Sequence, residues 1–118
     1  MMNLTDLARE IGAHVAAGGR PNCRAVDRVY AGDRISDLLT HASHTTLLVT
    51  NLSSALLVCV AELMDVPAIC LVGGQNPAPE IIAAARSRGM FLMVSPVDLF
   101  ETCGRVHRCW NDARPAGA

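Results

Sequence analysis

The sequence predicts a three-layer α/β domain, in which helices cover both faces of a mostly parallel sheet of about four to five strands. Three short apolar segments, 46–50, 68–72 and 90–94, alternate with segments of helical periodicity, a pattern typical of βα units with buried strands. Hydrophobic residues make up 51% of the 118 residues but aromatic residues only 3%, so the core is expected to be aliphatic. A chain of this length fits one domain.

The start of the chain predicts an amphipathic helix, since apolar residues recur there at helical spacing: Leu4, Leu7, Ala8, Ile11 and Val15. Gly18 and Gly19 are expected to end this helix. The next segment, 23–30, mixes apolar and charged residues. It predicts a half-exposed strand near the edge of the sheet.

Helices are also predicted between the strands. One covers 34–42, with Asp33 as its cap, and the next runs to about Met64 after a cap at Asn51 or Ser53.

A third helix opens at Pro77 or Pro79 and ends at Gly89, following the preference for proline first and glycine last. The final helix opens near Ser95. Residues 1–110 are therefore expected to form the single domain and residues 111–118 a flexible tail.

One predicted helix is apolar all the way round, because 55–61 contains only Ala, Leu, Val and Cys. Such a helix is buried on more than one side. In so small a domain the second covering surface is expected to be another copy of the chain, so the protein is predicted to be a homo-oligomer, with a dimer favoured.

Charge and cysteine content narrow the class of protein. The net charge is -1, with 10 Lys and Arg against 11 Asp and Glu, which argues against nucleic acid as a partner. Five cysteines form an odd count, typical of a reduced, intracellular protein. Without a signal peptide or a long apolar segment, the chain is expected to be cytoplasmic and not to bind membranes.

Polar and glycine residues follow each predicted strand and suggest a ligand site. After the strand 68–72 come Gly73, Gly74, Gln75 and Asn76, whose backbone N–H groups are candidates to hold a phosphate or another small anion. The alternative is a turn that needs glycine for backbone reasons.

Two other junctions add candidates. Asp33 and Arg34 follow one strand, and Thr50 and Asn51 end the next. The carboxyl ends of parallel strands share one edge, so Arg34 is predicted to meet the Gly74 loop there and bind the anion. The alternative is capped helices with surface charges.

Catalytic and metal signals are weak. Cys103 and His107 have helical i, i+4 spacing, but Cys109 falls off that face and no fourth ligand stands nearby. His41 and His44 fit the last turn of a helix better than a metal site. No nucleophile or phosphate-binding motif occurs, so neither catalytic residues nor cofactors are predicted.

Between about Leu4 and Val106, the chain resembles the DRTGG domain, a family related to the N-terminal domain of HPr kinase/phosphatase. The resemblance rests on "YAGDRISDLL", "LLVTN", "AICLVGG", "PAPEIIAAARSRGMFLMVSP" and "DLFET". The chain looks like the stand-alone form of this domain. The resemblance implies a self-associating αβα domain of regulatory character with no established reaction, since the kinase activity of HPr kinase belongs to its other domain.

The preferred interpretation is a non-catalytic regulatory module that senses a small anionic or nucleotide-like ligand or docks on a protein partner. Two alternatives remain: a small enzyme whose active site lies at a subunit interface, and a structural assembly subunit without a ligand.

Overall fold

The computed structural model describes residues 3–19 and 25–113. Five strands form one sheet in the order β1-β5-β4-β3-β2. They are β1 (His14–Gly18), β2 (Arg28–Ala31), β3 (Thr46–Thr50), β4 (Ala68–Leu71) and β5 (Phe91–Val94). Strands β2 to β5 are parallel, whereas β1 pairs antiparallel with β5 at one edge.

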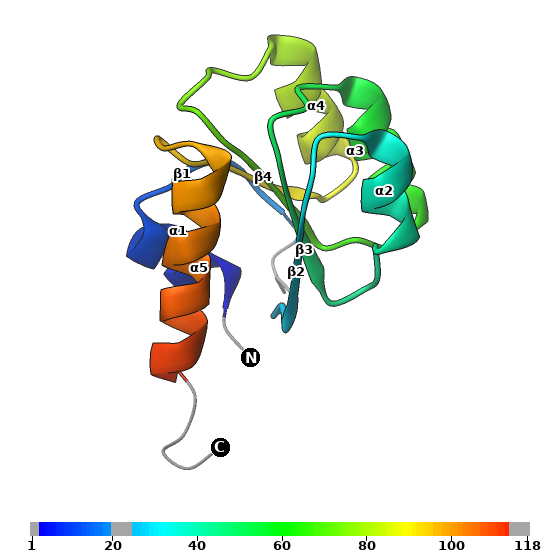
Figure 1. Cartoon of the computed structure of the whole chain (residues 1–118). Helices are drawn as coiled ribbons and strands as arrows, with labels where there is room; N and C mark the ends of the chain where they lie inside the picture. The colour runs from blue at the N-terminus through cyan, green and yellow to red at the C-terminus, as the bar shows by residue number, and fades with distance from the viewer. Residues whose placement is uncertain (1–2, 20–24, 114–118) are drawn as a thin grey trace.

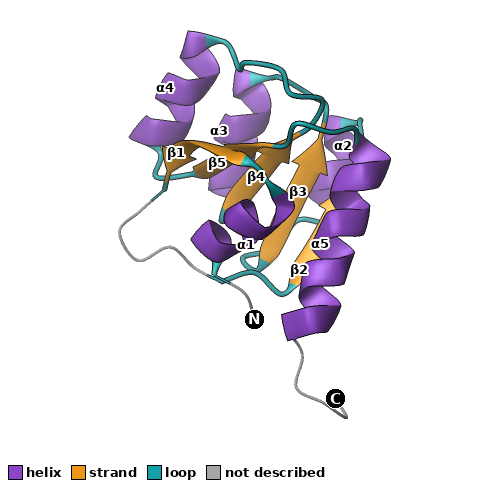
Figure 2. Cartoon of the chain, turned by 90° about the vertical axis from the view of Figure 1, so that its left-hand side faces the viewer, coloured by secondary structure: helices purple, strands orange, loops and turns teal. Residues whose placement is uncertain are grey.

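Helices cover both faces of this sheet, as Figures 1 and 2 show. They are α1 (Leu4–Ile11), α2 (Ile35–Thr40), α3 (Ala55–Leu63), α4 (Pro79–Ser87) and α5 (Leu99–Ala113). Helices α2, α3 and α4 lie on one face and α1 and α5 on the other. The three helices share a face because β2 to β5 follow one another in one direction, and each crossover has the same hand. The predicted fold class is confirmed.

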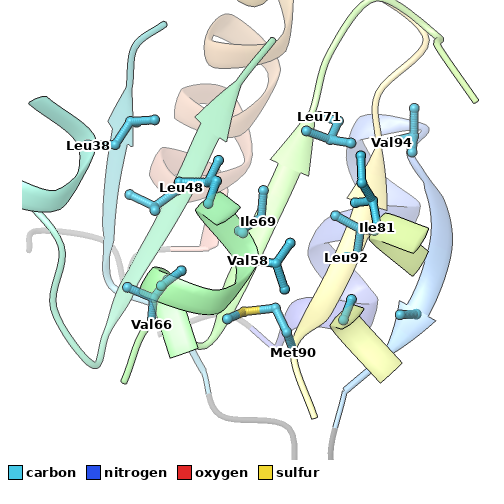
Figure 3. Packing of buried hydrophobic residues seen from close by; sticks show 14 residues of the cluster. Leu38, Leu48, Val58, Val66, Ile69, Leu71, Ile81, Met90, Leu92 and Val94 are labelled. Atoms are coloured by element: carbon cyan, nitrogen blue, oxygen red, sulfur yellow. The ribbon is translucent and has the colours of Figure 1, made fainter. Parts of the chain in front are cut away.

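Side chains of successive strand residues enter opposite layers of the core. In β3, Leu48 packs toward α2, α3 and α4, while Leu47 and Val49 pack toward α1 and α5. Figure 3 shows the first of these layers, in which Val58 and Ile81 meet the strand side chains. Every residue of β3, β4 and β5 is buried, which explains their unbroken apolar runs.

The opening helix is shorter than predicted. It ends at Ile11, and Gly12 follows with a φ of 75°, a left-handed cap that glycine adopts without a steric penalty. The residues after it form β1, which buries Ala17 against the core. Val15 therefore belongs to a strand, and its helical spacing from Ile11 is coincidental. The pairing of β1 with β5 is a tertiary contact that overrides the local pattern.

Several predicted boundaries and caps also shift. The edge strand is confirmed as β2, although residues 23 and 24 of the predicted segment lie outside the described residues. Asp33 does not cap α2, whose N-cap is Arg34 without a side-chain bond. Ser54, not Asn51 or Ser53, caps α3, since its hydroxyl accepts from the Leu57 N–H at 3.3 Å.

The last helix extends beyond its predicted end. α5 runs to Ala113, so residues 111–113 belong to the helix and not to the expected tail. The rest of that tail, 114–118, lies outside the described residues.

Two buried hydroxyls join β5 to α5. Ser95 and Thr102 are both fully buried, and their hydroxyl oxygens lie 2.7 Å apart. The Thr102 hydroxyl also donates to the Val97 carbonyl at 3.3 Å, and the Ser95 hydroxyl accepts from the Val97 N–H at 3.4 Å. This network sets the direction in which α5 leaves the sheet.

We predict that Thr102→Val lowers the free energy of unfolding by about 1–3 kcal/mol, because the buried Ser95 hydroxyl loses the Thr102 hydroxyl as a hydrogen-bond partner. Urea denaturation followed by circular dichroism measures the change. The exposed Ser87 hydroxyl bonds the Ala84 carbonyl, and Ser87→Ala is the control, with an effect within about 0.5 kcal/mol. Equal effects of the two substitutions would contradict the importance of the buried network.

Candidate ligand site at the carboxyl ends of the parallel strands

The residues predicted to form the site all lie at one edge of the sheet, where the arrows in Figure 2 point. Asp33 and Arg34 follow β2, Thr50 ends β3 and Asn51 follows it, and the loop 73–76 follows β4. Parallel pairing from β2 to β4 brings these three junctions to the same edge. The sequence prediction of a shared edge is therefore correct.

Arg34 and Gly74 are not on neighbouring strands, however. β3 lies between β2 and β4, and two strand spacings put the ends of β2 and β4 about 10 Å apart. Thr50 and Asn51 occupy the place between them. A ligand that contacted both Arg34 and the glycine loop would have to extend across the end of β3.

The glycine loop already uses part of its hydrogen-bonding capacity. The Gly73 N–H donates to the Val97 carbonyl and the Gly74 N–H to the Ser95 carbonyl, both at 2.8 Å. These two groups are thus unavailable to an anion. Within the described part of the chain, the backbone N–H groups of Gln75 and Asn76 have no acceptor.

The bonds of the glycine loop close the crevice between β4 and β5. The helix after β4 lies on one face of the sheet and the helix after β5 on the other, and such a divergence of adjacent strands is where α/β sheets commonly bind ligands. Here the two loops are hydrogen-bonded together. Gly73 and Gly74 have φ values of 84° and 67°, so they serve the turn, which was the alternative explanation for these glycines.

Thr50 is also structural. Its side chain is fully buried, and its hydroxyl accepts from the Leu52 N–H at 3.1 Å. Asn51 and Asp33 are exposed. Of the predicted site residues, those still able to reach a ligand are the exposed polar ones.

Arg34 is an exposed cation at this edge. Its guanidinium lies 4.0 Å from the Asp37 carboxylate, and the two side chains are 74% and 54% exposed. An exposed ion pair of this kind contributes little free energy, so a phosphate or carboxylate ligand can replace Asp37 at small cost.

The described residues contain no group of three or more His, Cys, Asp or Glu side chains that could hold a metal ion. Cys103 is half-buried, and burial raises the pKa of its thiol. His107 lies 3.1 Å from the Asn111 amide nitrogen. Burial raises the pKa of the neighbouring Cys70 thiol to about 12, which keeps it protonated at neutral pH.

The sequence did not predict one ring contact beside the edge strand. His41, at the end of α2, stacks on Tyr30 of β2 with ring centroids 4.1 Å apart and an angle of 13° between the planes. His41 and Tyr30 are eleven positions apart, so no local pattern indicates the contact.

The fold and the site together define a small three-layer α/β domain in which backbone hydrogen bonds hold Gly73 and Gly74 and exposed polar groups surround them. The chain belongs to the DRTGG domain family, whose sequence pattern matches residues 6–109. A search of curated proteins found no match. No helix in the described part of the chain is long and apolar enough to span a membrane.

The fold is similar to a solved structure, the CBS and DRTGG domains of the regulatory region of Clostridium perfringens pyrophosphatase in complex with its activator, diadenosine tetraphosphate. The TM-score is 0.75 and the sequence identity 16%. The match covers 88% of this chain but only 45% of that one. It shows the fold alone, and this chain spans less than half the length of its structural neighbour.

We predict that Gly74→Ala lowers the free energy of unfolding by about 1–2 kcal/mol, because a left-handed backbone disfavours a Cβ atom. The added carbon would make an ordinary van der Waals contact with the Pro96 carbonyl oxygen, at 3.5 Å, so the expected loss comes from the backbone conformation and not from a clash. Gly104, within α5, has open space around its Cβ position, so Gly104→Ala is the control and should stabilise the protein. Thermal unfolding measures both. A neutral Gly74→Ala variant would show that the loop does not depend on its glycine.

Proposed function

We propose that this chain is a non-catalytic regulatory module that acts as a homodimer and responds to a small anionic or nucleotide-like ligand. The ligand binds where the carboxyl ends of the parallel strands meet, which we call the carboxyl edge of the sheet. The observation that carries the proposal is an apolar stripe on the outside of α3. Membership of the DRTGG family and the regulatory role named for the structural neighbour support it.

The stripe consists of Leu56, Cys59 and Leu63, which share one face of α3 at i, i+3 and i+7 spacing. Leu56 is 62% exposed and Leu63 is 79% exposed. The opposite face of α3 packs on the sheet through Leu57, Val58 and Ala61. Since the stripe contributes nothing to the domain's own core, a second copy of α3 is its natural cover.

Residues on the inward face of α3 cannot serve to test association. Leu57 is 1% exposed and Val58 is 2% exposed, so neither residue faces a partner. The apolar sequence of the helix alone would have allowed either residue to do so. A charge at Leu57 or Val58 would unfold the domain.

We predict a dimer at micromolar concentration by light scattering, and a monomer for Leu56→Glu and for Leu63→Glu, because each buries an unpaired carboxylate in the interface. Ala83 is exposed on α4, so Ala83→Glu is the matched control and should remain dimeric. Circular dichroism checks that all three variants fold. A monomeric parent protein would overturn the dimer.

The ligand part of the proposal rests on what remains free at the carboxyl edge. The Arg34 guanidinium is exposed and weakly paired, and the N–H groups of Gln75 and Asn76 have no acceptor among the described residues. Arginine binds phosphate and carboxylate in bidentate geometry. We place the anion between these two groups, over the end of β3.

The position of α3 links the two parts. Its N-terminal end lies at the carboxyl edge, directly after β3, and Leu56 of the stripe is its second residue. A ligand at this edge would therefore lie beside the dimer contact. Binding at one and association at the other can then be coupled in both directions.

We predict that at least one of pyrophosphate, acetyl phosphate and ATP raises the melting temperature of the protein by mass action. Arg34→Ala should lower the affinity for that ligand at least tenfold, since charge-assisted hydrogen bonds contribute about 1.5–3 kcal/mol. Arg86 is an exposed arginine in the last turn of α4, and Arg86→Ala is the control. Equal affinity in both variants, with the fold intact, would remove the ligand from this edge.

A further inference from the structure

We propose that a cavity between β2 and α5, on the opposite side of the sheet from α3, binds a planar nitrogen heterocycle that carries an amino group. The proposal deepens the proposed function, since it gives the nucleotide-like ligand a place for its ring. It rests on different residues from the anion site.

The cavity has a volume of about 430 Å³, within the range of pockets that hold small molecules. Two regular elements build it. Asp27, Val29 and Ala31 alternate along β2 and its lead-in, so they share one face of the sheet. α5 supplies Cys103, Val106, His107 and Trp110, whose spacing places them along one side of the helix.

The wall and the rim differ in chemistry. Val106 is buried and Trp110 is half-buried, so the interior offers apolar surface with an aromatic ring. Asp27 is exposed at the rim, and its carboxylate makes no hydrogen bond or ion pair within the described part of the chain. An unpartnered acceptor thus stands beside an aromatic surface.

This combination selects the class of ligand. An aromatic side chain stacks on a planar base, and a carboxylate accepts hydrogen bonds but donates none. Asp27 therefore favours an amino group or a ring N–H and repels a phosphate. His107 adds a ring nitrogen on the α5 side of the cavity. An amino-substituted heterocycle can stack on the aromatic wall and donate a hydrogen bond to the carboxylate at the rim, whereas a free anion can do neither.

The cavity exists because β2 is an incompletely covered edge strand. Its residues are exposed or half-buried, and Val29 is 36% exposed. α5 packs against β3, which leaves space beside β2 on that face. A flat ligand in this space would cover apolar surface that the chain itself leaves open.

Trp110 is the only tryptophan of the chain, so its fluorescence reports directly on this cavity. We expect adenosine, which carries an amino group and no phosphate, to quench it saturably. Purine riboside, which lacks the amino group, should bind at least fivefold more weakly. Asp27→Asn should weaken the binding of adenosine by at least the same factor. Asp37→Asn removes the negative charge beside Arg34 and is the control, which should leave the binding of adenosine unchanged.

Calorimetry with Trp110→Leu tests the aromatic wall, and loss of adenosine binding is expected. Absence of saturable quenching by adenosine up to millimolar concentration would overturn the inference. Equal binding of adenosine and purine riboside to the parent and to Asp27→Asn would overturn the assigned ligand class. Adenosine binding lost in Arg34→Ala but kept in Asp27→Asn would place the ring at the carboxyl edge instead. None of these outcomes alters the dimer test on α3, so the two proposals fail separately.

Discussion

The constraint on which this structure depends is the burial of β3, β4 and β5 on both faces. Strands of that kind have no polar face, so every backbone group must pair within the sheet and both faces need helices. Three crossover helices cover one face. The other face depends on α1 and α5, and the Ser95 and Thr102 hydroxyls set the point where the chain passes to it.

The coverage of the two faces is unequal, and the surface features follow from that. α2, α3 and α4 stand side by side over one face, so α3 has a neighbour on each side and its remaining exposed face is a narrow apolar stripe. On the other face two helices cover five strands, and the space beside β2 stays open. The proposed dimer surface and the proposed ligand cavity thus lie on opposite sides of the same sheet.

At the carboxyl edge, the loops after β4 and β5 close a crevice in which α/β sheets commonly bind ligands. Adjacent strands whose following helices diverge usually leave a crevice for a ligand. In this chain the carbonyls of Ser95 and Val97 occupy the N–H groups of Gly74 and Gly73. The anion site proposed above therefore uses Arg34 and the exposed polar groups over the end of β3, and not the glycine N–H groups.

The sequence by itself determined the layer architecture, because buried strands and capped helices can be predicted from short patterns of neighbouring residues. The runs that became β3, β4 and β5 and the apolar helix α3 are of this kind. Strand β1 was missed because its pairing with β5 joins residues distant in sequence. The N-cap of α3 is Ser54 and not Asn51 or Ser53, because the helix begins at Ala55 and the Ser54 hydroxyl accepts from the Leu57 N–H three residues on. Only the tertiary structure decided that β3 separates Arg34 from Gly74, that Leu57 faces inward while Leu56 faces outward, and that Asp27 and Trp110 line one cavity. Strand order and helix rotation arise from packing over the whole chain, and no local pattern encodes them.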